Sequence, residues 1–311
     1  MSIDAKPSRA VIYSELGGPE VLRLVQLDVA APSHGEVRVR FVAGGLNPVD
    51  AKIRGGRSRF QMALPVAVGR EFSGVVESVG PGVDDLQPGD AVFGSIPQGG
   101  FADWVLAPVE AVARVPEGVS FEVAAGIALA GQTAWDALES QHVREGDVIV
   151  VSAAAGGVGG MLSQLAVARG VRVIGTASEG NHEWLRARGI EPVLYGDGLR
   201  ERLAAAAPHG ITAVFDQFGA ETIEAALALK VPADRINTIA TDASVYGVCN
   251  VGREAVHPPT LDALAALVAD GTLEVPIAAT YPLSEVRAAF EFLEAGHLRG
   301  KVVVTADSTA L

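Results

Sequence analysis

Apolar and polar residues follow different periods in different parts of the chain. Between residues 9 and 125, short apolar segments alternate with Gly and Pro turns. In residues 36–41, for example, Val37, Val39 and Phe41 occupy every second position. Alternation of this kind predicts half-buried strands, and many short strands between turns predict a small, partly open barrel or sandwich.

Longer elements begin near residue 123. Residues 148–151 are a continuous apolar run, typical of a strand that is buried on both faces. A Gly- and Ala-rich segment follows, then apolar residues at helical spacing, then a second apolar strand at residues 171–175. Strand, glycine-rich turn, helix and strand form a βαβ unit, and the alternating elements up to residue 239 predict a doubly wound parallel sheet.

Helices are expected on both sides of this change in pattern. Residues 123–129 and 133–138 have helical composition and are joined at Ala130-Gly131-Gln132. In the tail, helices begin at Pro258 and Ser284, and residues 301–305 are a last strand. We expect the tail to pack on the N-terminal domain. The predicted domains are therefore 1–124 with 254–311, and 125–253.

Composition and charge exclude several classes of protein. Of the 311 residues, 49% are apolar and 20% are charged, which suits a packed globular core. The net charge of −13 argues against nucleic acid and anionic membranes as partners, because both require positive patches. Cys249 is the only cysteine, so a disulfide framework or a thiolate zinc site within one chain is excluded.

The sequence contains no signal for export or membrane insertion. Residues 1–6 lack an apolar segment, and no apolar stretch reaches 18 residues. We therefore expect a cytoplasmic protein that does not enter a membrane.

The glycine-rich turn at residues 152–160 is the strongest candidate for cofactor binding. Ala154-x-Gly156-x-x-Gly159 matches the dinucleotide fingerprint, with alanine in the first glycine position. A pyrophosphate at a helix N-terminus is held by free backbone N–H groups and by the helix dipole, and side chains on the turn would block its approach. The flanking strands make dinucleotide binding the favoured interpretation over a purely structural turn.

The end of the second strand bears on which dinucleotide binds. An NAD site usually has an acidic residue there, on the ribose 2′-hydroxyl. This chain instead has Ser178, Asn181 and His182, which can donate hydrogen bonds to a 2′-phosphate, although Glu179 lies nearby. We therefore expect NADP(H) rather than NAD(H). The alternative is a solvated loop in which Ser178 or Asn181 is a helix N-cap.

The chain resembles the zinc-independent quinone oxidoreductase branch of the medium-chain dehydrogenase/reductase superfamily. The resemblance rests on motifs that span almost the whole chain in the order of the family. These are GGPEVL at 17–22, NPVD at 47–50, GREFSGVV at 69–76, PGDAVFG at 88–94, AAAGGVG at 153–159 and GKVVV at 300–304.

The resemblance implies a GroES-like catalytic domain and a Rossmann cofactor domain, with the active site in the cleft between them. It implies that NADPH reduces a quinone or the carbon–carbon double bond of an α,β-unsaturated carbonyl substrate. Many relatives are homodimers joined through edge strands. Residues 244–248 are the strand that would serve this role here.

The metal ligands of zinc-dependent relatives are replaced in this chain. Asn47 stands at the position of a cysteine ligand, and Arg70 at the position of a histidine ligand. A permanently charged guanidinium cannot ligate zinc. The four-cysteine structural zinc loop is also missing. We therefore expect no metal.

Four residues are candidates for the reaction itself. Asn47 would contact the nicotinamide ribose or the substrate oxygen, or alternatively cap the helix that follows. Asp50 would face the same cleft, or be a solvated acid of the first helical turn. Arg70 would form an ion pair with Glu71 that lines the site; the alternative is a purely structural ion pair. Thr133 resembles a family position near the nicotinamide; the alternative is a residue at a helix start.

The resemblance also implies further contacts to the cofactor. Tyr195 resembles a position at which relatives cover the adenosine phosphate, although a strand-end aromatic residue is the simpler account. The pyrophosphate contacts would come from Gly156, Gly157, Val158 and Gly159.

The leading hypothesis is an NADPH-dependent reductase of quinones or α,β-unsaturated carbonyls. One alternative is a metal-independent alcohol dehydrogenase, which lacks an obvious general base here. Another is a non-catalytic NADPH-binding sensor module. Enoyl thioesters are disfavoured as substrates, because the tyrosine that relatives use as proton donor is missing from residues 54–60.

Overall fold

The computed structural model describes residues 5–58, 60–252 and 256–307. The chain forms two compact units. The first consists of Met1–Leu129, Val256–Asp270 and Val275–Leu311, and the second of Ala130–Ala255 and Gly271–Glu274.

The first unit is built on two sheets. The larger has the strand order β15-β16-β3-β5-β6-β8, with β7 paired to β3, and the smaller has the order β2-β1-β4. The strands are β1 (Lys6–Tyr13), β2 (Arg23–Val29), β3 (Glu36–Leu46), β4 (Val66–Ala67), β5 (Glu71–Val79), β6 (Ala91–Ser95), β7 (Trp104–Pro108), β8 (Val112–Arg114), β15 (Ile277–Pro282) and β16 (Lys301–Thr305).

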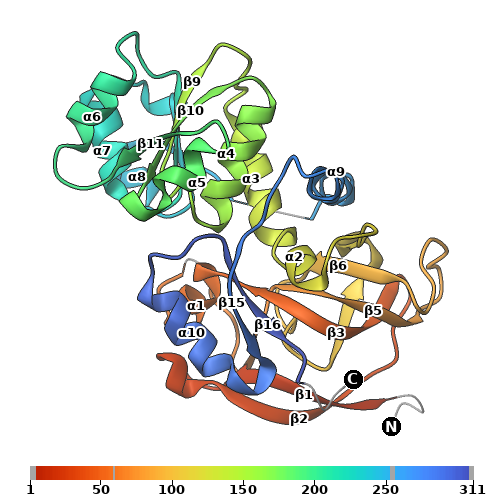
Figure 1. Cartoon of the computed structure of the whole chain (residues 1–311). Helices are drawn as coiled ribbons and strands as arrows, with labels where there is room; N and C mark the ends of the chain where they lie inside the picture. The colour runs from red at the N-terminus through yellow and green to blue at the C-terminus, as the bar shows by residue number, and fades with distance from the viewer. Residues whose placement is uncertain (1–4, 59, 253–255, 308–311) are drawn as a thin grey trace. The chain divides into compact units, whose positions relative to one another are not determined.

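The C-terminal strands complete the larger sheet. β16 pairs antiparallel with β3, and β15 pairs parallel with β16 (Figure 1). The alternating residues Val37, Val39 and Phe41 of β3 are buried in the core of this unit, as their spacing predicts. Sequence-distant strands therefore converge on β3.

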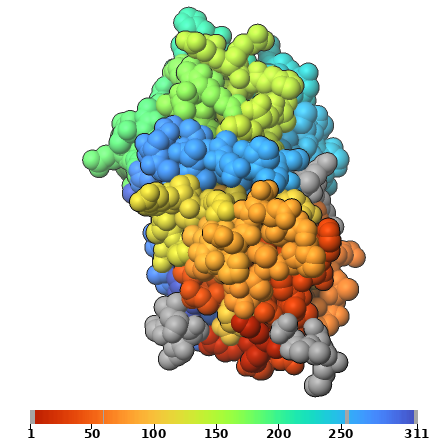
Figure 2. All heavy atoms as spheres, turned by 90° about the vertical axis from the view of Figure 1, so that its right-hand side faces the viewer, coloured from red at the N-terminus to blue at the C-terminus, as the bar shows by residue number. Residues whose placement is uncertain are grey.

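Helices cover this sheet. α10 lies against β15 and β16 and buries Val286 and Phe290 (Figure 1). In Figure 2, α9 forms a blue band beside the orange and yellow segment that includes β8, which it contacts. The helical elements are η1 (Pro19–Val21), α1 (Pro48–Arg54), η2 (Val109–Ala111), α2 (Phe121–Ala125), α9 (Pro258–Ala269), η5 (Leu283–Glu285) and α10 (Val286–Ala295).

The second unit is a parallel six-stranded sheet in the order β11-β10-β9-β12-β13-β14. Helices lie on both sides of it, with α6 and α7 opposite α4 and α5 (Figure 1). The strands are β9 (Val148–Val151), β10 (Arg172–Ala177), β11 (Glu191–Leu194), β12 (Ala213–Asp216), β13 (Ile236–Thr238) and β14 (Cys249–Asn250). The helical elements are α3 (Ala128–Ser140), α4 (Gly157–Ala168), η3 (Glu179–Asn181), α5 (His182–Arg186), α6 (Leu199–Ala206), α7 (Ala220–Ala228), η4 (Ala233–Arg235) and α8 (Ala243–Tyr246).

This architecture confirms the predicted fold class, a Rossmann doubly wound parallel sheet with a GroES-like β-rich domain. Among the described residues, no helix is long and apolar enough to cross a bilayer.

Two element predictions were wrong. Gly131 does not separate two helices, because α3 runs unbroken through it. A glycine inside a helix costs only about 1 kcal/mol relative to alanine, and burial of the neighbouring Ala130 and Ala134 offsets this. Residues 244–248 are not a strand. The side chain of Asp242 accepts a hydrogen bond from Ser244 N, and this cap starts α8 instead.

Candidate active site

Asn47 and Asp50 form the start of α1. β3 ends at Leu46, and Asn47 is the N-cap residue of the helix, with extended backbone angles. Its backbone N–H donates to Asp50 Oδ2 at 2.9 Å. Both residues are buried, with 5% and 6% of their surface exposed. Asp50 is therefore not the solvated acid of the alternative interpretation, and Asn47 is an N-cap whose side chain has other partners.

The side chain of Asn47 closes a ring of three hydrogen bonds. Its Nδ2 donates to Glu71 Oε2 at 2.7 Å, and its Oδ1 accepts from Lys301 Nζ at 2.6 Å. Lys301 Nζ also donates to Glu71 Oε2 at 2.7 Å. Glu71 and Lys301 are 0% and 3% exposed, so this ion pair is shielded from water. A fully buried pair needs such additional hydrogen bonds to offset the loss of hydration.

Glu71 reaches two further parts of the chain. Its Oε1 accepts from Leu129 N, in the first turn of α3, at 2.5 Å. A Cβ atom on Gly45 would lie 2.4 Å from Glu71 Oε2, so only glycine allows β3 to approach the carboxylate this closely. The ion-pair partner of Glu71 in the structure is Lys301, whereas the sequence suggested Arg70.

The electrostatics of Asp50 reflect this surrounding network. Burial raises the pKa of its carboxyl to about 6, and the charge of Glu71 adds to the increase. The hydrogen bond from Asn47 N–H and the charges of Arg70 and Lys301 lower the pKa, but by less than burial raises it. Asp50 is thus a buried acid that can exchange a proton near neutral pH.

Arg70 contributes a cation whose charge lowers the pKa of Asp50. Its carbonyl oxygen accepts from Ser95 Oγ at 2.6 Å, which fixes the backbone between β4 and β5. The guanidinium carbon lies 5.7 Å from the ring centroid of Phe60. The buried Nε–H of Arg70 has no hydrogen-bond partner among the described residues. It is therefore an unsatisfied donor in the interior of the first unit.

In the second unit, the glycine-rich turn leads into the N-terminus of α4. Gly156 is the N-cap and α4 starts at Gly157, so Gly157, Val158 and Gly159 form its first turn. Their N–H groups have no partner within the helix. Ala154 N donates to Thr176 O at 3.0 Å, which holds the turn against the end of β10.

The other predicted cofactor contacts follow the neighbouring strands. After β10, Asn181 Nδ2 donates to Ser178 Oγ at 3.1 Å, and His182 Nε2 lies 3.3 Å from Ala177 O. After β11, Tyr195 is 39% exposed. The strands β9, β10 and β11 are parallel neighbours, so these residues and the glycine turn all lie at the carboxyl edge of one sheet.

Asp216 organises the same edge on the other side of β9. Its Oδ1 accepts from Ser152 Oγ at 3.0 Å, and from Gly219 N at 2.9 Å. Its Oδ2 accepts from the hydroxyls of Thr238 and Thr241 at 2.6 and 3.0 Å. One buried carboxylate therefore joins the ends of β9, β12 and β13.

Thr133 lies within α3, one turn after Leu129, and is buried. It is not a helix-start residue, since α3 begins at Ala128. Of the four predicted catalytic residues, the structure brings Asn47, Asp50 and Arg70 together in the first unit, and Thr133 belongs to the second unit.

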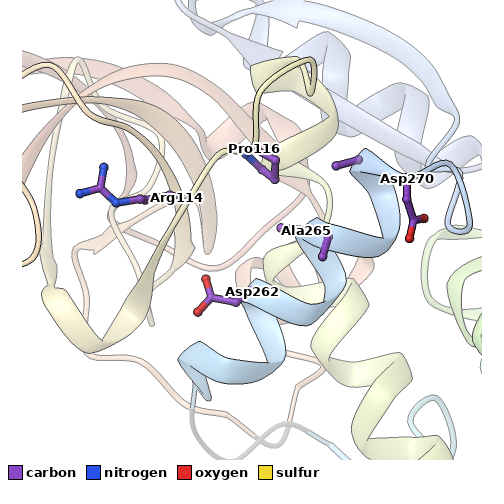
Figure 3. A pocket seen from close by; sticks show the side chains of 7 residues that line it. Arg114, Pro116, Asp262, Ala265 and Asp270 are labelled. Atoms are coloured by element: carbon purple, nitrogen blue, oxygen red, sulfur yellow. The ribbon is translucent and has the colours of Figure 1, made fainter.

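A hollow of about 630 Å³ on the first unit contains none of the predicted site residues (Figure 3). It lies between α9 and the segment after β8, and alanines 265, 266 and 269 contribute much of its lining. Arg114, which also lines it, is paired with Asp90 Oδ1 at 2.8 Å. Asp262 and Asp270 complete its lining, and none of the residues expected to bind the cofactor or the substrate is among them.

Sequence reasoning missed the roles of Glu71, Lys301 and Asp216. For Lys301 a signal was present: it precedes Val302-Val303-Val304, a fully buried strand, and a buried lysine requires a partner. For Asp216 the signal was an acid at the end of an apolar strand. The partners themselves are distant in sequence and could not be read from it.

Two protein families match the chain. The family described as alcohol dehydrogenase GroES-like domain matches residues 33–117, and the family described as zinc-binding dehydrogenase matches residues 189–304.

Known proteins match it as well. A quinone oxidoreductase of Pongo abelii is 39% identical over 181 residues, which is 57% of this chain and 55% of that protein. The chain thus spans about half the length of this relative. The solved quinone oxidoreductase of Coxiella burnetii is 30% identical, with a TM-score of 0.86 over 97% of this chain and 100% of that one. A mycobacterial protein solved in complex with NADPH is 31% identical, with a TM-score of 0.83 over 96% of this chain and 99% of that one.

Proposed function

Because this chain belongs to the quinone oxidoreductase branch of the medium-chain dehydrogenase/reductase superfamily, we propose that it is an NADPH-dependent oxidoreductase that works without zinc. Its substrate is a quinone or an α,β-unsaturated carbonyl compound. When bound, NADPH supplies the hydride. The residues of the chain bind the cofactor, orient the substrate and hold the charge that develops on it.

The N-terminus of α4 is the observation that carries this proposal. The turn before it has no side chain larger than alanine or serine between Ser152 and Gly157, so a pyrophosphate can approach the free N–H groups of the first turn. A side chain at Gly159 would collide with the turn itself. Ser178, Asn181 and His182 supply polar groups where a 2′-phosphate would lie, beside the carboxylate of Glu179, and Tyr195 supplies an exposed ring.

The first unit supplies the groups for the chemistry. The charge of Arg70, which acts at Asp50, suits the stabilisation of negative charge on a substrate oxygen, the task that zinc performs in metal-dependent relatives. Asp50 can store or release a proton close to neutral pH. Asn47 and Thr133 hold the cofactor. Asn47 and Arg70 do not form a zinc site, since neither an amide held by Lys301 nor a guanidinium is a ligand for this metal.

The protein is also proposed to be a homodimer. β14 is the last strand in the order of the parallel sheet, and an edge strand of this kind can pair with a second copy. Light scattering on the purified chain tests this assembly.

Activity is tested by following NADPH oxidation with a quinone and with an enone, side by side, with product analysis. Turnover that persists after treatment with a chelator supports the proposal. Turnover that is lost with the chelator and restored by zinc contradicts metal independence. Tight NADPH binding without turnover of either substrate favours the sensor alternative.

A further inference from the structure

The ring formed by Asn47, Glu71 and Lys301 determines the orientation of the Asn47 amide. Lys301 can only donate hydrogen bonds, and an ionised Glu71 can only accept them. The oxygen of Asn47 must therefore face Lys301 at 2.6 Å, and its nitrogen must face Glu71 at 2.7 Å. An amide flipped by half a turn would place N–H against ammonium and oxygen against carboxylate.

This arrangement leaves the side chain of Asn47 with one unused hydrogen-bonding position, a lone pair on its oxygen. Both hydrogens of Nδ2 are directed at the protein, one at Glu71 and the other at Gly45 O, 3.3 Å away. Oδ1 has two lone pairs, and Lys301 occupies one of them. Asn47 can thus accept one more hydrogen bond and has no unengaged donor.

We propose that Lys301 and Glu71 are positioning residues that make Asn47 a hydrogen-bond acceptor for a hydroxyl or N–H group of the bound cofactor. The inference rests on the proposed function, and it decides between the two roles that the sequence left open for Asn47. The oxygen of a quinone or enone needs a donor, which Asn47 does not offer. That oxygen is left to Arg70, whose guanidinium can only donate hydrogen bonds.

The test uses variants of the full chain that keep the buried charge balanced. Glu71→Gln combined with Lys301→Met removes both charges, so that neither is left unpaired in the core, and it frees the amide of Asn47 to flip. Arg38→Met with Glu77→Gln is the matched control, because it removes another largely buried ion pair of the same unit, in which Arg38 Nε and Glu77 Oε2 are 2.7 Å apart. Thermal unfolding of each variant verifies that it folds.

The first readout is the dissociation constant of NADPH, measured by direct titration. We expect Asn47→Ala and the Glu71→Gln/Lys301→Met variant to weaken binding by similar factors, roughly 5- to 20-fold, while the control variant binds as the parent does. Lys301→Arg keeps a cation that can only donate hydrogen bonds, so its NADPH affinity should lie between that of the parent and that of the double variant. The KM for the quinone should be unchanged. Parental NADPH affinity in the folded double variant, or an effect on the KM for quinone alone, would overturn the inference.

The second readout needs neither cofactor nor activity. In the NMR spectrum of the free protein, we expect the two side-chain amide hydrogens of Asn47 to exchange slowly with solvent in the parent and quickly in the double variant. Fast exchange in the parent would refute the fixed orientation. If the parent binds NADPH but reduces no quinone or enone, the proposed function fails, while the titration and the exchange measurement still test the role of Lys301 and Glu71.

Discussion

Gly159 approaches Ala153 so closely that a Cβ atom on the glycine would lie 2.4 Å from the alanine carbonyl oxygen. The same atom would lie 2.8 Å from Ser152 O. Both neighbours are backbone atoms of the turn, which cannot rotate away as a side chain would. The close approach of α4 to the end of β9 therefore depends on the absence of a side chain at this position.

Gly159→Ala should displace the turn and weaken NADPH binding by at least about 10-fold, because the N–H groups that hold the pyrophosphate move with it. Gly160→Ala is the matched control. Its Cβ would meet its nearest neighbour, Ala154 O, at 3.5 Å, which is ordinary contact. Titration of both variants with NADPH checks the prediction, and equal affinities would contradict it.

The buried carboxyl of Asp50 predicts a pH dependence of stability. Its pKa is about 6 in the folded protein and 3.8 as an ordinary value, so ionisation disfavours the folded state. The stability that the protonated form contributes is complete below about pH 4 and is lost as the pH rises through 6. A pKa difference of this size corresponds to about 3 kcal/mol.

Asp50→Asn should remove this dependence. Relative to the parent, its free energy of unfolding should rise by up to about 3 kcal/mol between pH 4 and pH 7, as measured by urea unfolding across that range. The other groups whose charges act at this site, Arg70, Lys301 and Glu71, are left in place. Asp84→Asn, at an exposed acid of the same unit, controls for the loss of one negative charge. If the difference in free energy of unfolding between Asp50→Asn and the parent stays constant from pH 4 to pH 7, the raised pKa of Asp50 is contradicted.

The hydrogen bonds of Asp216 predict a large effect on stability. Asp216→Ala leaves the donors of three strand ends without an acceptor, and should lower the free energy of unfolding of the second unit by at least about 3 kcal/mol. Ser152→Ala removes only one of these donors and should cost about 1 to 2 kcal/mol. Urea unfolding followed by the fluorescence of Trp135 and Trp184, both in this unit, measures the two variants. Similar losses would argue against Asp216 as the central acceptor.

Local patterns were sufficient to predict most elements of the fold. The apolar run of β9 and the final strand β16 have the predicted bounds, because the pattern of a buried strand is contained within a few residues. The predictions at Gly131 and at residues 244–248 were wrong because local patterns were not sufficient there. Helix α3 is supported by tertiary burial that composition does not reveal, and α8 by one capping side chain.

The candidate site was predicted only in part, because its contacts are long-range. Asn47 and Asp50 stand three residues apart and could be paired from the sequence, whereas Lys301 lies 254 positions from Asn47. Only the pairing of β16 with β3 brings the lysine to the amide. The burial of Asp50 follows from the same topology, which explains why a solvated acid was a reasonable but wrong alternative for it.

Discrimination between NADPH and NADH should depend on the loop after β10. Glu179 is exposed and adjacent to Ser178, whose hydroxyl accepts from Asn181. If a 2′-phosphate binds beside Ser178, the carboxylate of Glu179 repels it, and Glu179→Gln should tighten NADPH binding by about 2- to 5-fold with no effect on NADH. Ser178→Asp should have the opposite effect and weaken NADPH binding by at least about 10-fold, because a second carboxylate would then face the 2′-phosphate. In NADH, the same carboxylate could accept a hydrogen bond from the ribose 2′-hydroxyl.

Titration of both variants with both dinucleotides measures this preference directly. Glu183→Gln, one turn further along in α5, is the matched control for the loss of a negative charge nearby. If Ser178→Asp weakens the binding of NADH and NADPH equally, the substitution has disrupted the loop, and the loop does not discriminate by the 2′-phosphate. Comparable parental affinities for the two dinucleotides, left unchanged by Glu179→Gln, would show that the 2′-phosphate does not lie beside Ser178.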